Sequence, residues 1–213
     1  PSSLDSWSVA GTASGAGTIT LTAGGKTTTV AVTVGTVDQP VGDFSDLTKW
    51  RFSQARATGT LTSSTGPNGE PALRLQHDFT RQTGTRGSYA VSTTELPVAG
   101  QPQALSLWIK GDGTGAWPRI QLRRGDGTST NIDGPPVEWT GWRQVTFPIP
   151  AGTAYPLAIQ QIRFMETRST AKYHGDITVA GLAAKVPAET DLPEIPYVHD
   201  PVIIANGSVA DRP

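Results

Sequence analysis

The chain has 213 residues, and its 17 lysines and arginines nearly balance its 18 aspartates and glutamates, leaving a formal net charge of −1. This balance gives no reason to expect binding to nucleic acid or to an anionic membrane surface. No apolar run approaches the length of a membrane span, so we expect no membrane insertion. With no cysteine, the chain has no disulfides or thiolate metal sites. Its 24 glycines and 17 prolines, among many threonines and valines, favour an all-β domain of the secreted, extracellular type.

Residues 1–37 predict a small β unit at the start of the chain. Two strand-like segments, 17–22 and 27–34, flank the turn sequence Ala23-Gly24-Gly25-Lys26, and a shorter one lies at 7–9. Two or three strands are not stable alone. We therefore expect them to be the end of a truncated Ig-like domain or to dock on the domain that comes next in the chain. The segment resembles the closing strands of bacterial Ig-like repeats, which implies a partial Ig-like segment.

Residues 38–187 predict the main domain, an antiparallel jelly-roll β-sandwich. The strand pattern breaks at Asp38-Gln39-Pro40, which predicts a linker. Segments with strand character then recur, separated by turn sequences and without helices between them. They are 58–63, 72–79, 88–92, 105–110, 119–123, 131–133, 141–149, 159–167 and 175–184. Residues 188–213 predict a proline-rich linker and the start of a further domain, and with no initiator methionine or signal peptide the chain is expected to be a piece of a longer protein.

The stretch from Leu105 to Arg124 predicts two strands joined by a glycine-rich connection. Its apolar positions alternate with polar ones, as in half-buried strands. The predicted core positions are Leu105, Leu107, Ile109, Ile120 and Leu122. The residues predicted to share the opposite face are Trp108, Arg119, Gln121 and Arg123. That mixture suits a polar, planar ligand.

By its motifs the region 41–186 resembles a jelly-roll carbohydrate-binding module of the galactose-binding-like superfamily. The motifs are Phe44…Trp50, ALRL at 72–75, LSLWIKGDG at 105–113, WTGWRQV at 139–145 and GDITVAGL at 175–182. The resemblance implies a non-catalytic module that binds a polysaccharide or oligosaccharide. The whole layout also resembles the middle of large secreted actinobacterial proteins with phosphodiester glycosidase and metallophosphoesterase domains, which implies neighbouring domains as partners.

Many modules of this kind carry a structural Ca²⁺, and the resemblance implies its ligands here. Asp43 and Asp46 match the carboxylates near the first strand, and Asp176 is a substitute at the start of the last one. The sequence departs from the family at Ala180 and Gly181, where acidic residues are usual.

Sugar binding needs flat apolar surfaces for the C–H faces of the rings and planar donors and acceptors for the hydroxyls. Candidates of both kinds are Trp108, Trp117, Tyr89, Arg119, Gln121, Arg123 and Arg163. Alternatively, some of the tryptophans fill the core or cover loops. The arginines could instead bind an anionic sugar or a phosphate, or belong to a solvated face balanced by carboxylates.

Catalytic signals are weak. His174 and Asp176 could join His77 or Asp78 around a metal. No glycosidase pair can be argued from the spacing of the glutamates at 95, 138 and 166. We therefore predict a non-catalytic glycan-binding module that targets a neighbouring hydrolase domain. The alternative is a structural spacer without a ligand, and a third hypothesis, a hydrolase, requires a cleft that gathers His77, His174 and carboxylates.

Overall fold

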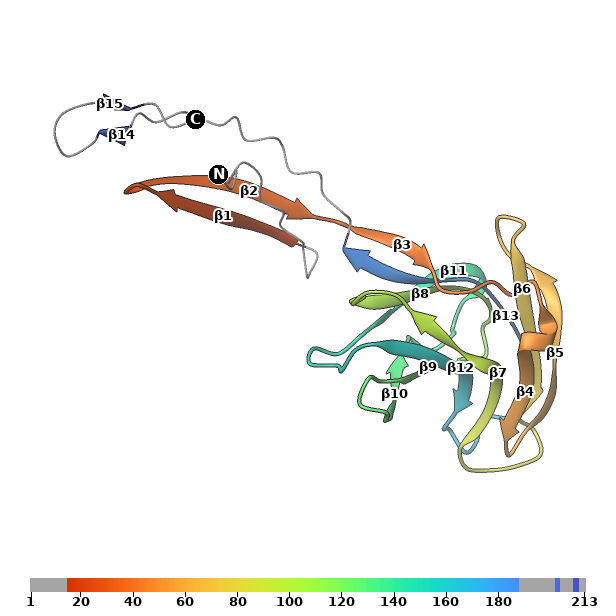
Figure 1. Cartoon of the computed structure of the whole chain (residues 1–213). Helices are drawn as coiled ribbons and strands as arrows, with labels where there is room; N and C mark the ends of the chain where they lie inside the picture. Colours follow the sequence, from red (N-terminus) through yellow and green to blue (C-terminus); the bar gives the residue numbers. More distant parts are fainter. Residues whose placement is uncertain (1–14, 188–201, 204–208, 211–213) are drawn as a thin grey trace.

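The structure is a computed structural model, and it describes residues 15–187 together with two short paired strands, β14 (Val202–Ile203) and β15 (Val209–Ala210). In this part of the chain the only helix is the 3₁₀ turn η1 (Leu47–Lys49), and every strand pairing is antiparallel. Two sheets pack face to face (Figure 1). The predicted all-β antiparallel sandwich is therefore confirmed. No helix of the described residues is long and apolar enough to cross a membrane.

One layer of the sandwich is a five-stranded sheet with the order β10-β9-β12-β7-β4. Its strands are β4 (Trp50–Ala55), β7 (Arg86–Val98), β9 (Trp117–Arg123), β10 (Ser129–Asp133) and β12 (Leu157–Glu166). The hairpin between β9 and β10 turns at Gly125-Asp126-Gly127-Thr128, and Gly127 has a φ of +79°, where a side chain would be strained.

The other layer is a six-stranded sheet with the order β11-β8-β13-β6-β5, and a sixth strand, β3, also pairs with β13. Its strands are β3 (Thr36–Pro40), β5 (Thr58–Thr65), β6 (Pro71–Asp78), β8 (Ala104–Asp112), β11 (Thr140–Pro148) and β13 (His174–Pro187). The long strand β13 thus holds β8 on one side and both β6 and β3 on the other.

The prediction of a linker at residues 38–40 is wrong, because these residues form the end of β3. Asp38 pairs with Lys185 and Pro40 pairs with Ala183. Proline is tolerated there since β3 lies at the edge of the sheet. Lys185 Nζ donates to Asp38 Oδ1 at 2.7 Å, so an ion pair reinforces the pairing. The entering strand is therefore fastened to the last strand of the domain.

The predicted hairpin near the start of the chain is present as β1 (Gly15–Ala23) and β2 (Lys26–Val34), with Gly24 and Gly25 as the two-residue turn. It projects away from the sandwich, continuing the direction of β3 (Figure 1). Ile19 pairs with Val30, and both side chains remain partly exposed. The strand predicted at residues 7–9 and the linker predicted after residue 187 lie outside the described residues, apart from β14 and β15.

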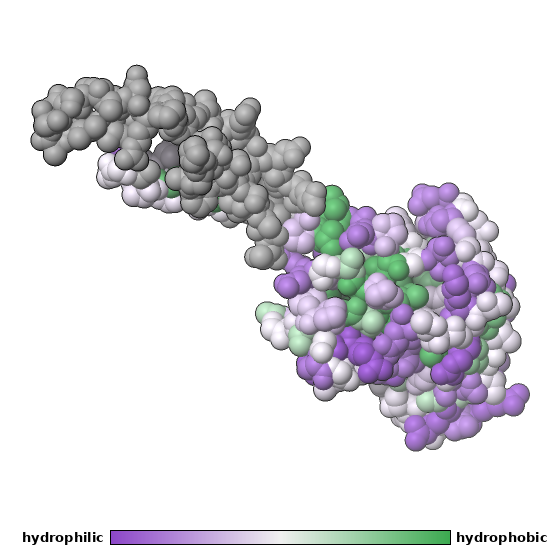
Figure 2. Space-filling model, in the orientation of Figure 1, coloured by the Kyte–Doolittle hydropathy of each residue, from purple (hydrophilic) through white to green (hydrophobic). Residues whose placement is uncertain are grey.

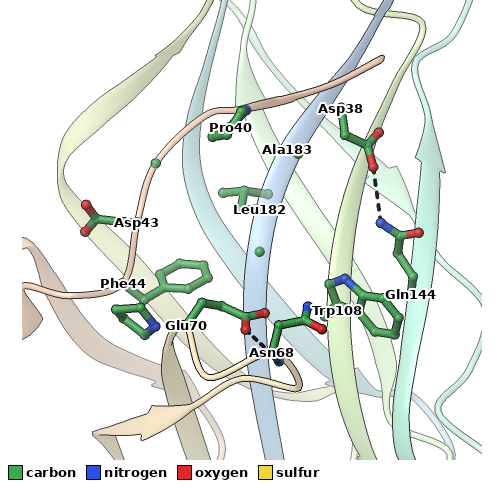
Figure 3. A pocket seen from close by; sticks show the side chains of 13 residues that line it. Asp38, Pro40, Asp43, Phe44, Asn68, Glu70, Trp108, Gln144, Leu182 and Ala183 are labelled. Carbon is green, nitrogen blue, oxygen red and sulfur yellow. Dashed lines mark hydrogen bonds between the residues drawn. The ribbon is translucent and has the colours of Figure 1, made fainter. Parts of the chain in front are cut away.

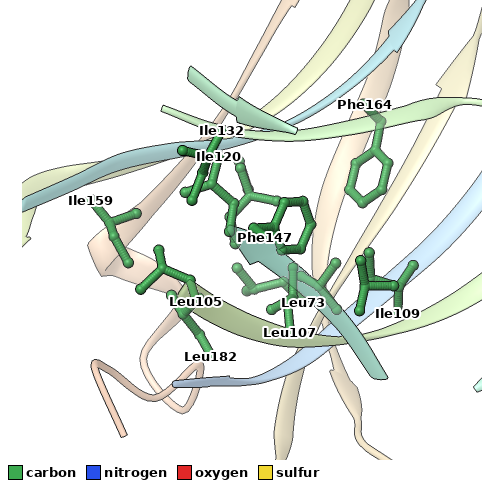
Figure 4. Close-up of a cluster of buried hydrophobic side chains, with 14 of the residues drawn as sticks. Leu73, Leu105, Leu107, Ile109, Ile120, Ile132, Phe147, Ile159, Phe164 and Leu182 are labelled. Atoms are coloured by element: carbon green, nitrogen blue, oxygen red, sulfur yellow. The ribbon is translucent and has the colours of Figure 1, made fainter. Parts of the chain in front are cut away.

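The core lies between the two sheets and contains the predicted aliphatic positions. Figure 4 shows side chains of both layers meeting there. The five core positions predicted from the stretch at 105–124, namely Leu105, Leu107, Ile109, Ile120 and Leu122, are all fully buried. The surface of the sandwich is mixed, with hydrophilic residues around a smaller hydrophobic area on the side shown in Figure 2.

Candidate functional site

Each sheet presents one outward surface, which we call the five-strand face and the six-strand face after their sheets. In both sheets, buried residues alternate with partly or fully exposed ones, along the whole of β9 and along β8 from Leu107 to Asp112. Side chains of adjacent strand residues point to opposite sides of a sheet. The partly exposed residues therefore identify the two outward faces.

The structure separates Trp108 from the residues with which it was predicted to share a face. Trp108 lies on β8 in the six-stranded sheet, whereas Arg119, Gln121 and Arg123 lie on β9 in the five-stranded sheet. The short connection between β8 and β9 crosses from one layer to the other. Because both strands put their apolar sides into the same core, their polar sides point in opposite directions. The prediction of one shared face is wrong for Trp108.

Trp108 instead borders a hollow of about 320 Å³ on the six-strand face (Figure 3). The walls of the hollow combine apolar side chains with Asn68, Glu70 and Gln144. Gln144 Nε2 donates to Asp38 Oδ2 at 3.2 Å, and Glu70 Oε2 accepts from the backbone N–H of Asn68 at 2.8 Å. Two of its polar groups are therefore already engaged with the protein itself.

The five-strand face brings together the other six predicted ligand residues, which are Tyr89, Trp117, Arg119, Gln121, Arg123 and Arg163. The strand register arranges the outward residues in rows that run across the sheet. One row is Asn131, Gln121, Gln161, Val91 and Arg51, and the next is Asp133, Arg119, Arg163, Tyr89 and Ser53. Trp117 and Met165 begin a third row beside them. Six side chains predicted from separate segments thus form one surface.

Two arginines on this face are neutralised by carboxylates. Arg119 and Asp133 form a bidentate pair, with Nη2 to Oδ2 at 3.2 Å. Arg123 and Glu95 form another, with Nε to Oε1 at 2.8 Å, and this pair lowers the pKa of Glu95. These pairs agree with the alternative of a balanced, solvated face for two of the arginines.

Arg163 lies at the centre of the face and differs from those two arginines. Its Nη2 donates to Gln121 Oε1 at 3.0 Å and its Nη1 to Asn131 Oδ1 at 3.3 Å, both neutral oxygens. Its guanidinium carbon is 5.3 Å from the centre of the Tyr89 ring. Burial lowers the pKa of Arg163, the charge of nearby Arg119 lowers it further, and Tyr89 acts in the opposite direction.

The aromatic groups of the face are held in fixed positions. Trp117 Nε1 donates to the Gly134 carbonyl at 3.0 Å, and the guanidinium of Arg119 stacks 4.2 Å from the centre of its ring. Trp117 and Met165 also border a hollow of about 450 Å³ at the edge of the face, together with Glu138 and Arg168. The face therefore continues into a concave region with an aromatic wall.

The three predicted calcium ligands do not come together. Asp43 accepts from the backbone and hydroxyl of Ser45, and Asp46 caps η1. Asp176 instead pairs with Arg74. The segment that leads to Asp43 contacts β13 at Leu182, whose carbonyl accepts from the N–H of Val41. Asp176 lies about six residues along β13 from Leu182, which is on the order of 20 Å. Among the described residues no group of three or more acidic or histidine side chains is placed to hold a metal. The predicted set does not fit one Ca²⁺ site.

The groups considered for catalysis are not gathered in a cleft. His77 is buried at 3% exposure, whereas the side chain of His174 is 77% exposed on the surface. Glu166 borders the same hollow as Glu138. Burial raises the pKa of Glu166, but hydrogen bonds from Arg168 and Tyr173 outweigh this and lower it, so the carboxylate is ionised and already paired.

No family profile matches this sequence, and no curated protein matches it. Among solved structures it is similar to a family 11 carbohydrate-binding module of a Clostridium thermocellum cellulosomal cellulase, with 16% identity, a TM-score of 0.46, and coverage of 71% of this chain and 95% of that one. It is also similar to the mannan-recognising module TmCBM27, with 14% identity, a TM-score of 0.43, and coverage of 71% and 98%. Likeness at this level identifies neither the ligand nor the residues that would bind it.

Sequence reasoning missed several members of the five-strand face, namely Asn131, Asp133, Gln161 and Met165. A signal for the first two was available. The Gly-Asp-Gly-Thr turn fixes the register of β9 and β10, which places Asn131 beside Gln121 and Asp133 beside Arg119. Gln161 and Met165 follow only from the pairing of β12 with β9, which has no local signal in the sequence.

Proposed function

We propose that the five-strand face binds a carbohydrate chain and that this domain is a non-catalytic glycan-binding module. The observation that carries the proposal is the meeting of two aromatic rings with planar arginine, glutamine and asparagine side chains on one continuous surface. Such planar groups make paired hydrogen bonds with neighbouring hydroxyls, and aromatic rings pack against the C–H faces of sugars.

The size of the face suits a chain of sugars better than a single one. Five strands about 4.8 Å apart span about 19 Å across the sheet. The hollow beside Trp117 and Met165 extends this surface at one side. A glycan chain lying along the row of Arg163 would meet Arg119, Arg163 and Tyr89 in turn. Gln121 and Trp117 lie in the rows on its two sides.

The wider role is part of the same proposal. We infer that the chain belongs to a secreted multidomain protein, in which this module holds a neighbouring hydrolase domain on a cell-wall polysaccharide or exopolysaccharide. The strand patterns before and after the sandwich support this inference. So does the resemblance of the layout to secreted actinobacterial proteins with phosphodiester glycosidase and metallophosphoesterase domains.

Replacing Trp117 by alanine should weaken glycan binding about five- to thirtyfold, because an aromatic contact of this kind contributes about 1–2 kcal/mol and the replacement also frees Arg119 from its stacked position. A glycan array identifies a binding polysaccharide, and isothermal titration calorimetry measures the dissociation constant. The matched control is Trp108→Ala on the six-strand face, which should leave the constant unchanged. Loss of binding with Trp108→Ala and not with Trp117→Ala would move the site to the other sheet.

The structural spacer stays the alternative, and the two balanced pairs, Arg119 with Asp133 and Arg123 with Glu95, favour it. Paired charges of this kind are common on solvated surfaces and contribute little to binding. The two functions differ in one measurement. A spacer should bind no polysaccharide on a broad glycan array, whereas a glycan-binding module should bind at least one.

A further inference from the structure

The five-strand face carries more positive than negative charge, although the whole chain is nearly neutral. Four arginines point outward from it, at positions 51, 119, 123 and 163, and the carboxylates of Asp133 and Glu95 neutralise two of them. Within the described residues neither Arg51 nor Arg163 has a carboxylate within ion-pair distance. Two positive charges therefore lie without a counter-charge on the surface proposed to bind glycans.

Arg163 is the better placed of these two cations. A guanidinium has five N–H donors, and in this structure two of them reach side-chain oxygens, those of Gln121 and Asn131. Its Nε is buried without a hydrogen-bond partner among the described residues. Arg119, whose charge repels it, is the residue opposite it on β9. The surroundings of Arg163 hold its side chain in place but leave its charge unbalanced.

An unbalanced cation that is partly removed from water is unfavourable in the free protein and favours an anion that completes the site. Planar carboxylates match the fork of a guanidinium and form two parallel hydrogen bonds with it. Asp133 and Glu95 lie on either side of the central region and are occupied by their own arginines. They would not compete for Arg163.

We propose that the glycan bound by the five-strand face is acidic, and that the carboxylate of a uronic acid unit binds at Arg163. This inference rests on the proposed function, since it names the class of glycan taken by the same face. Arg51 lies two strands away from Arg163 on β4, about 10 Å across the sheet, and offers a second cation to an acidic unit further along the chain.

The test compares each acidic polysaccharide with its own carboxyl-reduced form, in which the carboxylate has become a primary alcohol on the same backbone. Polygalacturonate, alginate and glucuronoxylan supply three such pairs, and a sulfated galactan with its desulfated form asks whether any anion suffices. By calorimetry, at least one uronate polymer should bind about tenfold or more tightly than its reduced form. This preference should shrink as sodium chloride is raised from about 0.05 to 0.5 M, because salt screens the charge interaction.

Two variants assign the preference to Arg163. Gln121→Glu keeps the oxygen that already accepts from Arg163 and adds the missing counter-charge, so the acidic preference should fall to about twofold or less while the fold is kept. Arg163→Gln should have the same effect. Arg81→Gln changes the net charge equally but removes an arginine of the connection between β6 and β7, outside the five-strand face, where Asp78 already pairs with it, so it should leave the preference unchanged. Thermal melts confirm that each variant is folded.

The outcomes separate this inference from the proposed function. Equal binding of the acidic and reduced forms would overturn the acidic-ligand inference and leave the glycan-binding function standing. A preference that survives both Gln121→Glu and Arg163→Gln would also overturn the assignment to Arg163. Binding of the sulfated galactan alone would replace the uronate by a sulfate ester. Failure of every polymer, acidic or neutral, would remove the proposed function itself.

Discussion

Replacing Arg86 by methionine should lower the free energy of unfolding by about 3–5 kcal/mol. Arg86 is fully buried, and its guanidinium donates to four backbone carbonyls, those of Phe79, Gly84, Arg168 and Ala171. Methionine fills a similar volume but donates no hydrogen bond. The carbonyls that Arg86 satisfies would then lose its hydrogen bonds in a buried site, which is costly.

The position of Arg86 explains why the loss should be felt by the whole sandwich. Its carbonyl partners come from two connections, one between β6 and β7 and the other between β12 and β13, and each connection links the two sheets. Chemical denaturation followed by tryptophan fluorescence measures the change. The control is Arg81→Met in the first connection, where the arginine side chain is 78% exposed, and this change should stay within about 0.5 kcal/mol. Equal effects of the two substitutions would contradict the structural role of Arg86.

Much of the fold could be predicted because it depends on alternation and turn chemistry, which are local. The period of two in β8 and β9 placed five residues in the core correctly, and the turn at Gly24-Gly25 defined the first hairpin. Strand β3 was mistaken for a linker because Asp38-Gln39-Pro40 has no apolar alternation. All five residues of β3 are exposed, so their strand state depends on pairing with β13 and has no signal of its own.

The candidate site was predictable in its composition but only partly in its geometry. Six of the seven proposed ligand residues share a face. Alternation is local and predicts that each of them points outward, whereas their place in one sheet depends on the pairing of β12 with β9 and β7, which has no local signal. Trp108 fell on the other face because nothing in the sequence around Gly113 shows that the chain changes layers there. The network of Arg86 was missed for the same reason. Its partners lie up to 85 residues away in sequence and are backbone carbonyls, which any residue provides.

The buried side chain of His77 should make the domain lose stability in mildly acidic solution. Burial lowers the pKa of His77 to about 4 from its ordinary value of 6.5, although the charges of Asp112, Asp176 and Asp78 act in the opposite direction. Above pH 6.5 the residue is neutral in both the folded and the unfolded state and has no effect. Between pH 6.5 and pH 4 the unfolded chain takes up a proton that the folded domain resists. Stability should therefore fall by about 3 kcal/mol as the pH drops from 7 to 4.

His77→Phe isolates this contribution. The ring of His77 packs 4.2 Å from that of Phe79 and lies over Gly175, where no side chain intervenes, so a phenyl ring keeps most of the packing without a titratable group. Carboxylates with a lowered pKa, such as Asp43 and Glu95, also lose their contribution as the pH falls, but they do so equally in both proteins. Urea denaturation at pH 7, 5.5 and 4 should show the unfolding free energies diverging in favour of the variant. Parallel pH profiles would mean that His77 is protonated in the folded domain, and that the space around its ring admits water or a counter-charge.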